Sequence, residues 1–187
     1  PIARKIDKKY YAAGLSLVQI FPSGPQSSSR PIEQLLLEAI YSAQREIVLT
    51  TPYFIPSEAL LTALRSAALR GVHVVLIVPA RVDSVLVRYA SNAYFNDLLP
   101  FGVEVLRFDD GLLHTKSMVI DTEVTIFGTV NLDIRSFELN FEVSVIAYDR
   151  PFSAATRELQ ARYAAQSRPI DPVQWLARPW WRRTLEN

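Results

Sequence analysis

One histidine and a nearby lysine give this sequence its clearest chemical signal. One residue separates His114 from Lys116, and Asp121 follows the lysine on the same stretch. Side chains two positions apart in an extended chain point to the same side, so His114 and Lys116 should face together with Thr115 opposite. A neutral imidazole is a nucleophile, a protonated one is a general acid, and an ammonium group neutralises phosphate oxygens. The pair therefore predicts chemistry on a phosphoryl group.

A second group of polar residues follows on the next two predicted strands. Gly128 would let the backbone approach a ligand closely, while Thr129 and Asn131 offer a hydroxyl and an amide to phosphoryl oxygens. A tight turn at residues 122–123 should fold the strands back to back and bring Asn131 near the histidine. Glu142 could then accept from one ring nitrogen and fix the orientation of the imidazole. Each residue alone could be a turn or surface residue, and only the joint spacing is specific.

The composition sets limits on the class of protein. Hydrophobic residues make up 49% and aromatic residues 11% of the 187 residues, which is typical of one globular domain. The net charge of +1 gives no overall polyanion signal, so nucleic acid or anionic lipid would have to be bound by local patches. The absence of cysteine excludes disulfides, thiolate metal sites and a cysteine nucleophile. The longest apolar run, residues 74–80, is far shorter than the roughly 20 residues of a membrane-spanning helix.

Strands and helices alternate along most of the chain. This order predicts an α/β fold with a mainly parallel sheet, right-handed crossovers and helices on both faces. A helix is also expected between Ser57, which can cap it, and Gly71, which can end it. The expected strands are residues 15–21, 46–51, 72–78, 103–108, 113–120, 124–127 and 141–148, and the other expected helices are residues 31–45, 84–99 and 151–166.

The other histidine and the two ends of the chain carry weaker signals. His73 lies in an apolar strand without polar neighbours in sequence, so a structural role is expected. Residues 1–14 are basic and predict a lead-in or linker, or else a contact for acidic headgroups. Residues 168–187 mix tryptophan with arginine, which is typical of a membrane interface. The alternative is that Trp175 and Trp180 pack on the domain.

The joint spacing resembles a known motif. His114-x-Lys116-x4-Asp121-x6-Gly128-Thr129-x-Asn131 is similar to the HKD motif of the phospholipase D superfamily, with threonine in the usual place of serine. Three further segments resemble the C-terminal half of bacterial cardiolipin synthases: PSGP at 22–25, TTPYFIP at 50–56 and NLDIRSFELNFE at 131–142. The resemblance implies a phospholipase D-like domain over residues 15–167. Its expected fold is an α-β-α sandwich with a mixed, largely parallel central sheet.

The same resemblance implies a mechanism without metal or other cofactor. Two HKD motifs would meet at one site, where one histidine attacks phosphorus and the other transfers protons to and from the alcohols. Two phosphatidylglycerols would then give cardiolipin and glycerol through a phosphohistidine, at the bacterial inner membrane. The implied catalytic set is His114, Lys116 and Asp121, with Lys116, Thr129 and Asn131 as phosphate-binding residues and Glu142 as the histidine-orienting residue. His114 would be the general acid and base, and Asp121, on the opposite strand face, is expected to be structural.

The sequence departs from this pattern because it holds one HKD motif and no second His-x-Lys. The second histidine would have to come from a missing N-terminal half or from a homodimer. Pro1 at the start favours a truncated piece, whose isolated monomer should have little or no activity. Two alternatives remain open: a homodimeric phosphodiesterase or nuclease that uses water, and a non-catalytic membrane-binding domain. The near-neutral charge favours phosphatidylglycerol, cardiolipin and a membrane surface as partners over nucleic acid.

Overall fold

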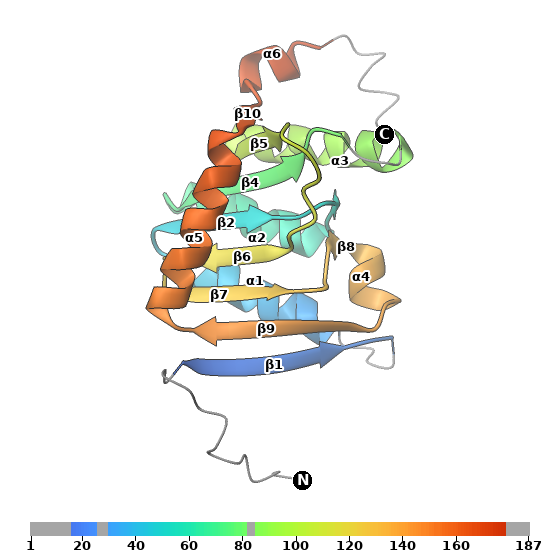
Figure 1. Ribbon diagram of the computed structural model, residues 1–187. Coiled ribbons are helices and arrows are strands. Elements are labelled where there is room, and N and C mark those ends of the chain that lie inside the picture. Colours follow the sequence, from blue (N-terminus) through green and yellow to red (C-terminus); the bar gives the residue numbers. More distant parts are fainter. Residues whose placement is uncertain (1–15, 26–29, 82–84, 179–187) are drawn as a thin grey trace, which may run out of the picture.

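The protein forms a large sheet covered by helices on both faces (Figure 1). The computed structural model describes residues 16–25, 30–81 and 85–178, so the predictions for residues 1–14 and Trp180 lie outside the described residues. The strands are β1 (Leu17–Ser23), β2 (Glu46–Thr50), β3 (Phe54–Ile55), β4 (His73–Pro79), β5 (Glu104–Phe108), β6 (Ser117–Ile120), β7 (Val124–Gly128), β8 (Leu132–Asp133), β9 (Glu142–Tyr148) and β10 (Ser167–Pro169). The helices are α1 (Pro31–Ser42), α2 (Glu58–Leu69), α3 (Val85–Leu98), α4 (Ile134–Glu138), α5 (Arg150–Ala165) and α6 (Pro172–Leu176), with a 3-10 turn at Leu99–Phe101.

The main sheet has the strand order β1-β9-β7-β6-β2-β4-β5-β10. The expected α/β class with a mixed sheet between helices is confirmed, but the expectation that parallel pairing prevails is wrong. Only β2 with β4 and β4 with β5 pair in parallel, and the other neighbours in this sheet are antiparallel. A parallel pair needs a long crossover, which α2 and α3 provide. Strand β7 follows β6 after three residues, which is far too short for a crossover.

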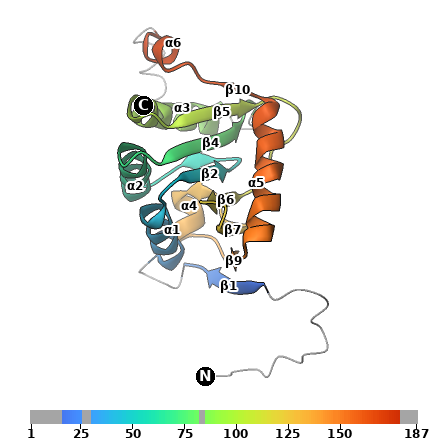
Figure 2. The same cartoon turned by 90° about the vertical axis from the view of Figure 1, so that its left-hand side faces the viewer.

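Two hydrophobic cores lie on opposite faces of the sheet. Figure 2 shows α5 on one side and α1, α2 and α3 on the other. The larger core joins α1, α2 and α3 to the sheet, with fully buried members such as Ile32, Leu49 and Phe54. The smaller core lies under α5 and contains Val48, Val75, Ile77, Leu106, Phe108 and Leu113. Alternation along each strand therefore decides which side chains meet α5.

The helices begin where the sequence indicates. Pro31 occupies the first turn of α1, where the missing N–H of proline removes no helical hydrogen bond. Ser57 caps α2 as expected, because its hydroxyl accepts from the backbone N–H of Leu60 at 3.2 Å. Within the described residues, no helix is both long enough and apolar enough to cross a bilayer.

Strand β6 is shorter than the predicted strand at residues 113–120. It starts at Ser117, which pairs with Thr50, the last residue of β2. Since β2 ends there, residues 113–116 have no β2 partner and run as an extended segment outside the strand. The short parallel pair β3–β8, joining Phe54 to Leu132, and helix α4 were not predicted.

The described part of the C-terminal region belongs to the domain. Strand β10 pairs with β5, and Trp175 on α6 is buried. The indole N–H of Trp175 donates to Asn96 at 3.1 Å, and its ring lies 5.9 Å from that of Phe95. The alternative that Trp175 packs on the domain is therefore confirmed.

His73 differs from the expectation of an apolar setting. It stands at the exposed start of β4, and its Nε2 lies 3.2 Å from the carboxylate of Glu104 on the neighbouring strand. The sequence pattern missed this pair because the two residues meet only through the pairing of β4 with β5.

Candidate active site

His114 and Lys116 lie together at one end of the sheet. The ammonium nitrogen of Lys116 is 3.2 Å from Nδ1 and 3.4 Å from Nε2 of His114, and it donates to the backbone oxygen of His114 at 3.0 Å. The two side chains are therefore within hydrogen-bonding distance of each other. The predicted pairing of these two side chains is thus confirmed by the structure.

The ammonium of Lys116 is partly removed from water. Burial lowers the pKa of Lys116 below its ordinary value, while the negative charges of Glu142 and Asp133 oppose that change. The lysine therefore lies within electrostatic reach of the two strands that follow β7. A phosphoryl group at this position would bring the negative charge that a desolvated ammonium favours.

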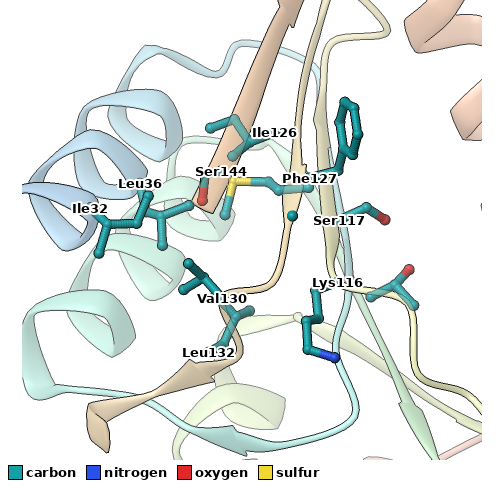
Figure 3. A pocket seen from close by; sticks show the side chains of 12 residues that line it. Ile32, Leu36, Lys116, Ser117, Ile126, Phe127, Val130, Leu132 and Ser144 are labelled. Carbon is teal, nitrogen blue, oxygen red and sulfur yellow. The ribbon is translucent and has the colours of Figure 1, made fainter. Parts of the chain in front are cut away.

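A small cavity of about 30 Å³ lies behind the lysine (Figure 3). Lys116 lines it from the segment before β6, Val130 from the connection between β7 and β8, and Leu132 from the start of β8. The cavity has room for about one water molecule, so it is no substrate pocket. Asn131, which stands between Val130 and Leu132, does not itself line the cavity.

Asn131 is half-buried, and its Oδ1 is buried without a hydrogen-bond partner among the described residues. A buried amide oxygen without a hydrogen-bond partner is unfavourable. Such oxygens are often found where a ligand or a water molecule binds. The expected closeness of Asn131 to the His114–Lys116 pair stays a prediction. Its role in binding phosphate stays a prediction.

Gly128 and Thr129 are bound to β9. A Cβ atom at Gly128 would lie 2.2 Å from the backbone oxygen of Val143, so only glycine allows this approach of β7 to β9. The hydroxyl of Thr129 accepts from the backbone N–H of Val143 at 3.0 Å. The close approach that Gly128 permits here is to strand β9, and an approach to a ligand stays a prediction. Thr129 holds the same strand, and phosphate binding by its hydroxyl stays a prediction.

Glu142 is the first residue of β9 and is half-buried. Its Oε1 accepts from the side-chain amide of Asn140 at 3.1 Å. Among the described contacts, the ring of His114 meets Lys116 whereas the carboxylate of Glu142 meets Asn140. The predicted orienting role of Glu142 toward His114 therefore stays a prediction, although its charge acts on Lys116.

Asp121 lies at the far end of β6 from His114. Its carboxylate accepts from the backbone N–H groups of Gln44, Arg45 and Glu46 at 2.9, 2.7 and 2.9 Å. Burial alone would raise the pKa of Asp121, but the three backbone donors outweigh it and the pKa is lowered. The placement of Asp121 in a catalytic set is therefore corrected, because the strand separates it from the imidazole and the backbone occupies its oxygens.

Asp121 also shapes the turn after β6. Asp121 and Thr122 have positive φ angles of 53° and 57°, as the central residues of a type I′ hairpin turn require. The turn is closed by the N–H of Glu123, which donates to the oxygen of Ile120 at 2.9 Å. It begins one residue earlier than predicted, because aspartate tolerates the left-handed region better than most residues.

The sequence interpretation missed Asp133. Its charge acts on Lys116, and its carboxylate caps α4 by accepting from the N–H of Ser136 at 2.7 Å. The signal was available, since Asp133 stands two positions after Asn131 and aspartate is among the preferred residues at the start of a helix. Within the described residues, no group of three or more His, Cys, Asp or Glu side chains could hold a metal ion, so no metal ligand is assigned.

Comparison with known proteins places the chain in a family. The sequence profile described as "Cardiolipin synthase, PLD-like domain" matches residues 36–164. Cardiolipin synthase A from Pectobacterium carotovorum is 47% identical over 170 residues, which are 91% of this chain and 35% of that protein. Cardiolipin synthase A from Serratia proteamaculans is 46% identical over the same shares. The chain thus spans about a third of the length of these relatives, within their C-terminal half.

Solved structures show the same fold. A phospholipase D family member, Nuc from Salmonella typhimurium, aligns with a TM-score of 0.71 at 23% identity, covering 83% of this chain and 99% of that one. Phosphatidylserine synthase from Haemophilus influenzae aligns with a TM-score of 0.68 at 17% identity, covering 90% of this chain and 44% of that one. Identities this low show the fold alone. Together with the profile match, they support one conclusion: the chain belongs to the family of phospholipase D-like domains of cardiolipin synthase.

Proposed function

We propose that this domain supplies one of the two histidines of a phosphatidyltransferase that makes cardiolipin and glycerol from two phosphatidylglycerols. The observation that carries the proposal is the contact of 3.2 Å between the partly desolvated ammonium of Lys116 and the ring of His114. A histidine and a lysine held this closely suit the transfer of a phosphoryl-linked group, because one side chain handles protons and the other handles negative charge. The family of the chain supplies the lipid context.

The proposed reaction has two steps. First, a histidine of a second HKD motif attacks the phosphorus of one phosphatidylglycerol and forms a P–N bond. The P–O bond to the headgroup glycerol breaks, and protonated His114 gives its proton to the oxygen of the leaving glycerol. Second, His114 takes the proton of a hydroxyl on the other phosphatidylglycerol, that oxygen attacks phosphorus, and the P–N bond breaks. Lys116 and Asn131 hold the non-bridging oxygens in both steps, with Thr129 as a weaker candidate. Glu142 would keep the ring in place.

The second histidine must come from another segment or another chain, since the sequence has one His-x-Lys pair. An incoming phosphatidyl group has to touch both histidines at once, so the second motif must dock at the His114 end of the sheet. An isolated monomer would therefore carry out little or no transfer. Because both substrates are lipids, the site would work at a membrane surface, which in a bacterium is the inner membrane.

The test is a chimera. The matching segment of Cardiolipin synthase A from Pectobacterium carotovorum, 47% identical, is replaced by this chain. The chimera is incubated with labelled phosphatidylglycerol and, in parallel, with DNA, and cardiolipin, water-hydrolysis products and DNA fragments are measured. We expect cardiolipin formation that is lost in His114→Gln and kept in His73→Gln.

The other possible outcomes of the chimera assay would favour a different function or contradict the role of His114. DNA or lipid cleavage by water without cardiolipin would favour the phosphodiesterase interpretation. Vesicle binding without any turnover by a folded chimera would favour a non-catalytic membrane domain. Full activity of the His114→Gln chimera would contradict the proposed role of this residue.

A further inference from the structure

The segment that carries His114 and Lys116 has a second face, and this face is bound by one helix. Leu113 is buried in the core under α5. The hydroxyl of Thr115 lies 3.1 Å from the phenol oxygen of Tyr163, and Nε2 of Gln160 donates to the hydroxyl of Ser117 at 3.1 Å. Both Gln160 and Tyr163 belong to α5. Alternation along the segment thus places His114 and Lys116 on one face. The residues between and beside them, Leu113, Thr115 and Ser117, lie on the face that contacts α5.

The two anchors are themselves fixed. Gln160 is fully buried, and its Nε2 also donates to the backbone oxygen of Val48 on β2 at 3.1 Å. The ring of Tyr163 packs edge-on against Phe108, with 5.5 Å between the ring centroids. Each anchor is therefore held by the sheet independently of its contact with the segment. Movement of the segment would therefore break its hydrogen bonds to Gln160 and Tyr163, because the sheet keeps these two side chains in place.

The anchor at Thr115 acts on residues 114–116, which lie outside β6, and the anchor at Ser117 acts on the first residue of β6 beside them. On the side of β2, no strand continues beyond Thr50 to fix the peptide planes of this segment. On the other side, the N–H of Gly128 donates to the oxygen of Lys116 at 3.3 Å. A rotation of these peptide planes would carry His114 away from the phosphoryl group, even with β6 intact.

We propose that Gln160 and Tyr163 are positioning residues, which hold Thr115 and Ser117 so that His114 and Lys116 face the reacting phosphate. The inference rests on the proposed function for its meaning in catalysis, but the geometric part can be tested without any substrate. Neither residue touches substrate in this arrangement. Each acts through the hydroxyl that it contacts.

The same helix offers a matched control. The hydroxyl of Thr125 on β7 donates to that of Ser153 on α5 at 2.9 Å, and both residues are fully buried. Ser153→Ala removes a buried hydrogen bond between α5 and the sheet, as the anchor variants do. It leaves the segment of His114 alone. General loosening of α5 is thereby separated from loss of the anchors.

The first experiment uses proton and nitrogen NMR of the chain itself. The chain has two histidines, so a His73→Gln background leaves the ring signals of His114 alone. In Tyr163→Phe, which keeps the ring packing, and in Gln160→Leu, we expect shifted His114 ring resonances and loss of the cross-peaks between His114 and the Lys116 side chain. Ser153→Ala should keep both. Unchanged spectra in both anchor variants, or an equal change in Ser153→Ala, would overturn the proposal.

The second experiment measures kcat and KM for phosphatidylglycerol in the chimera described above. We expect kcat to fall roughly tenfold in Gln160→Leu with KM nearly constant, because small displacements of catalytic groups cost rate more than binding. Thr115→Val should lower kcat while Thr115→Ser, which keeps the hydroxyl, should restore it, and Ser153→Ala should match the parent. If the parent chimera lacks activity, the proposed function fails, and the NMR result still decides the inference.

Discussion

The two ends of strand β6 treat their polar residues in opposite ways. At the far end, the carboxylate of Asp121 accepts from three consecutive backbone N–H groups and sits in a closed hairpin turn. At the near end, His114 is exposed and Lys116 is partly desolvated beside it. One end has a carboxylate whose oxygens are occupied by backbone donors, and the other has an exposed imidazole beside a partly desolvated ammonium.

Within this single motif, the environment of Asp121 stabilises its charge and that of Lys116 destabilises its charge. The backbone donors lower the pKa of Asp121, which stabilises the charged carboxylate in the folded state. Burial lowers the pKa of Lys116, which is a cost to the folded state. Functional sites commonly carry such costs. The motif thus combines a carboxylate bound by the backbone with a histidine and a lysine that we propose to be reactive, and its residues should respond differently to substitution.

The largest effect is expected for His114→Gln. Loss of the proton-transferring ring should reduce cardiolipin formation by roughly a thousandfold or more in the chimera. Because His114 is exposed, the free energy of unfolding should change by less than about 0.5 kcal/mol. Product formation and chemical denaturation measure the two quantities. A large loss of stability would show that His114, like Asp121, supports the fold, and would contradict the proposed difference between the two ends of β6.

A smaller loss of activity is expected for Lys116→Met. Removing one charge that stabilises the phosphoryl oxygens should lower kcat by about a hundredfold. Lys116→Arg should recover part of the rate, because the charge remains but the shape differs. Steady-state kinetics in the chimera test this. An unchanged kcat would mean that the lysine only packs against His114.

The opposite pattern is expected for Asp121→Ala. It should lower the free energy of unfolding by about 2 kcal/mol, because three N–H groups lose a charged acceptor. The rate per folded molecule should stay near that of the parent. The folded pKa of Asp121 is lowered, so its stabilisation is full above the unfolded pKa of about 3.9 and disappears as pH falls through the folded pKa. The difference in the free energy of unfolding between the two proteins, measured by chemical denaturation, should therefore stay constant from pH 7 to about pH 4 and shrink only at lower pH.

The smallest effect concerns stability at the near end. Lys116→Met should raise the free energy of unfolding at pH 7 by less than about 1 kcal/mol, since it removes a desolvated charge. The folded pKa lies below the unfolded one, so the parent gains stability as pH rises between the two values. The difference between parent and variant should shrink toward pH 10. A destabilised Lys116→Met would show that the lysine belongs to the structural part of the motif.

Much of this arrangement could be predicted from local patterns. Apolar periodicity and caps place α1, α2 and the parallel strands, and the alternation of side chains places His114 and Lys116 on one face. The resemblance to the HKD motif selects the residues at the active end. These features depend on residues close together in the chain, where spacing carries the information.

The remainder depends on contacts between distant segments. The antiparallel pairing of β6 with β2, the pair His73–Glu104 and the binding of Asp121 to residues 44–46 all arise from sheet order. Gly128 is needed because β9 passes close to it, which its own neighbours in sequence do not reveal. The anchoring of Thr115 and Ser117 by α5 spans more than forty residues. Spacing alone cannot report such pairings.

The most direct test of the half-site is complementation. The chain, verified as a monomer, is mixed with the separately produced N-terminal part of the Pectobacterium relative, and cardiolipin formed from labelled phosphatidylglycerol is measured. We expect no product from either partner alone, product from the mixture, and none from the mixture with His114→Gln. Turnover by the monomeric chain alone, or full activity of the His114→Gln mixture, would contradict the claim that His114 is half of a two-histidine site.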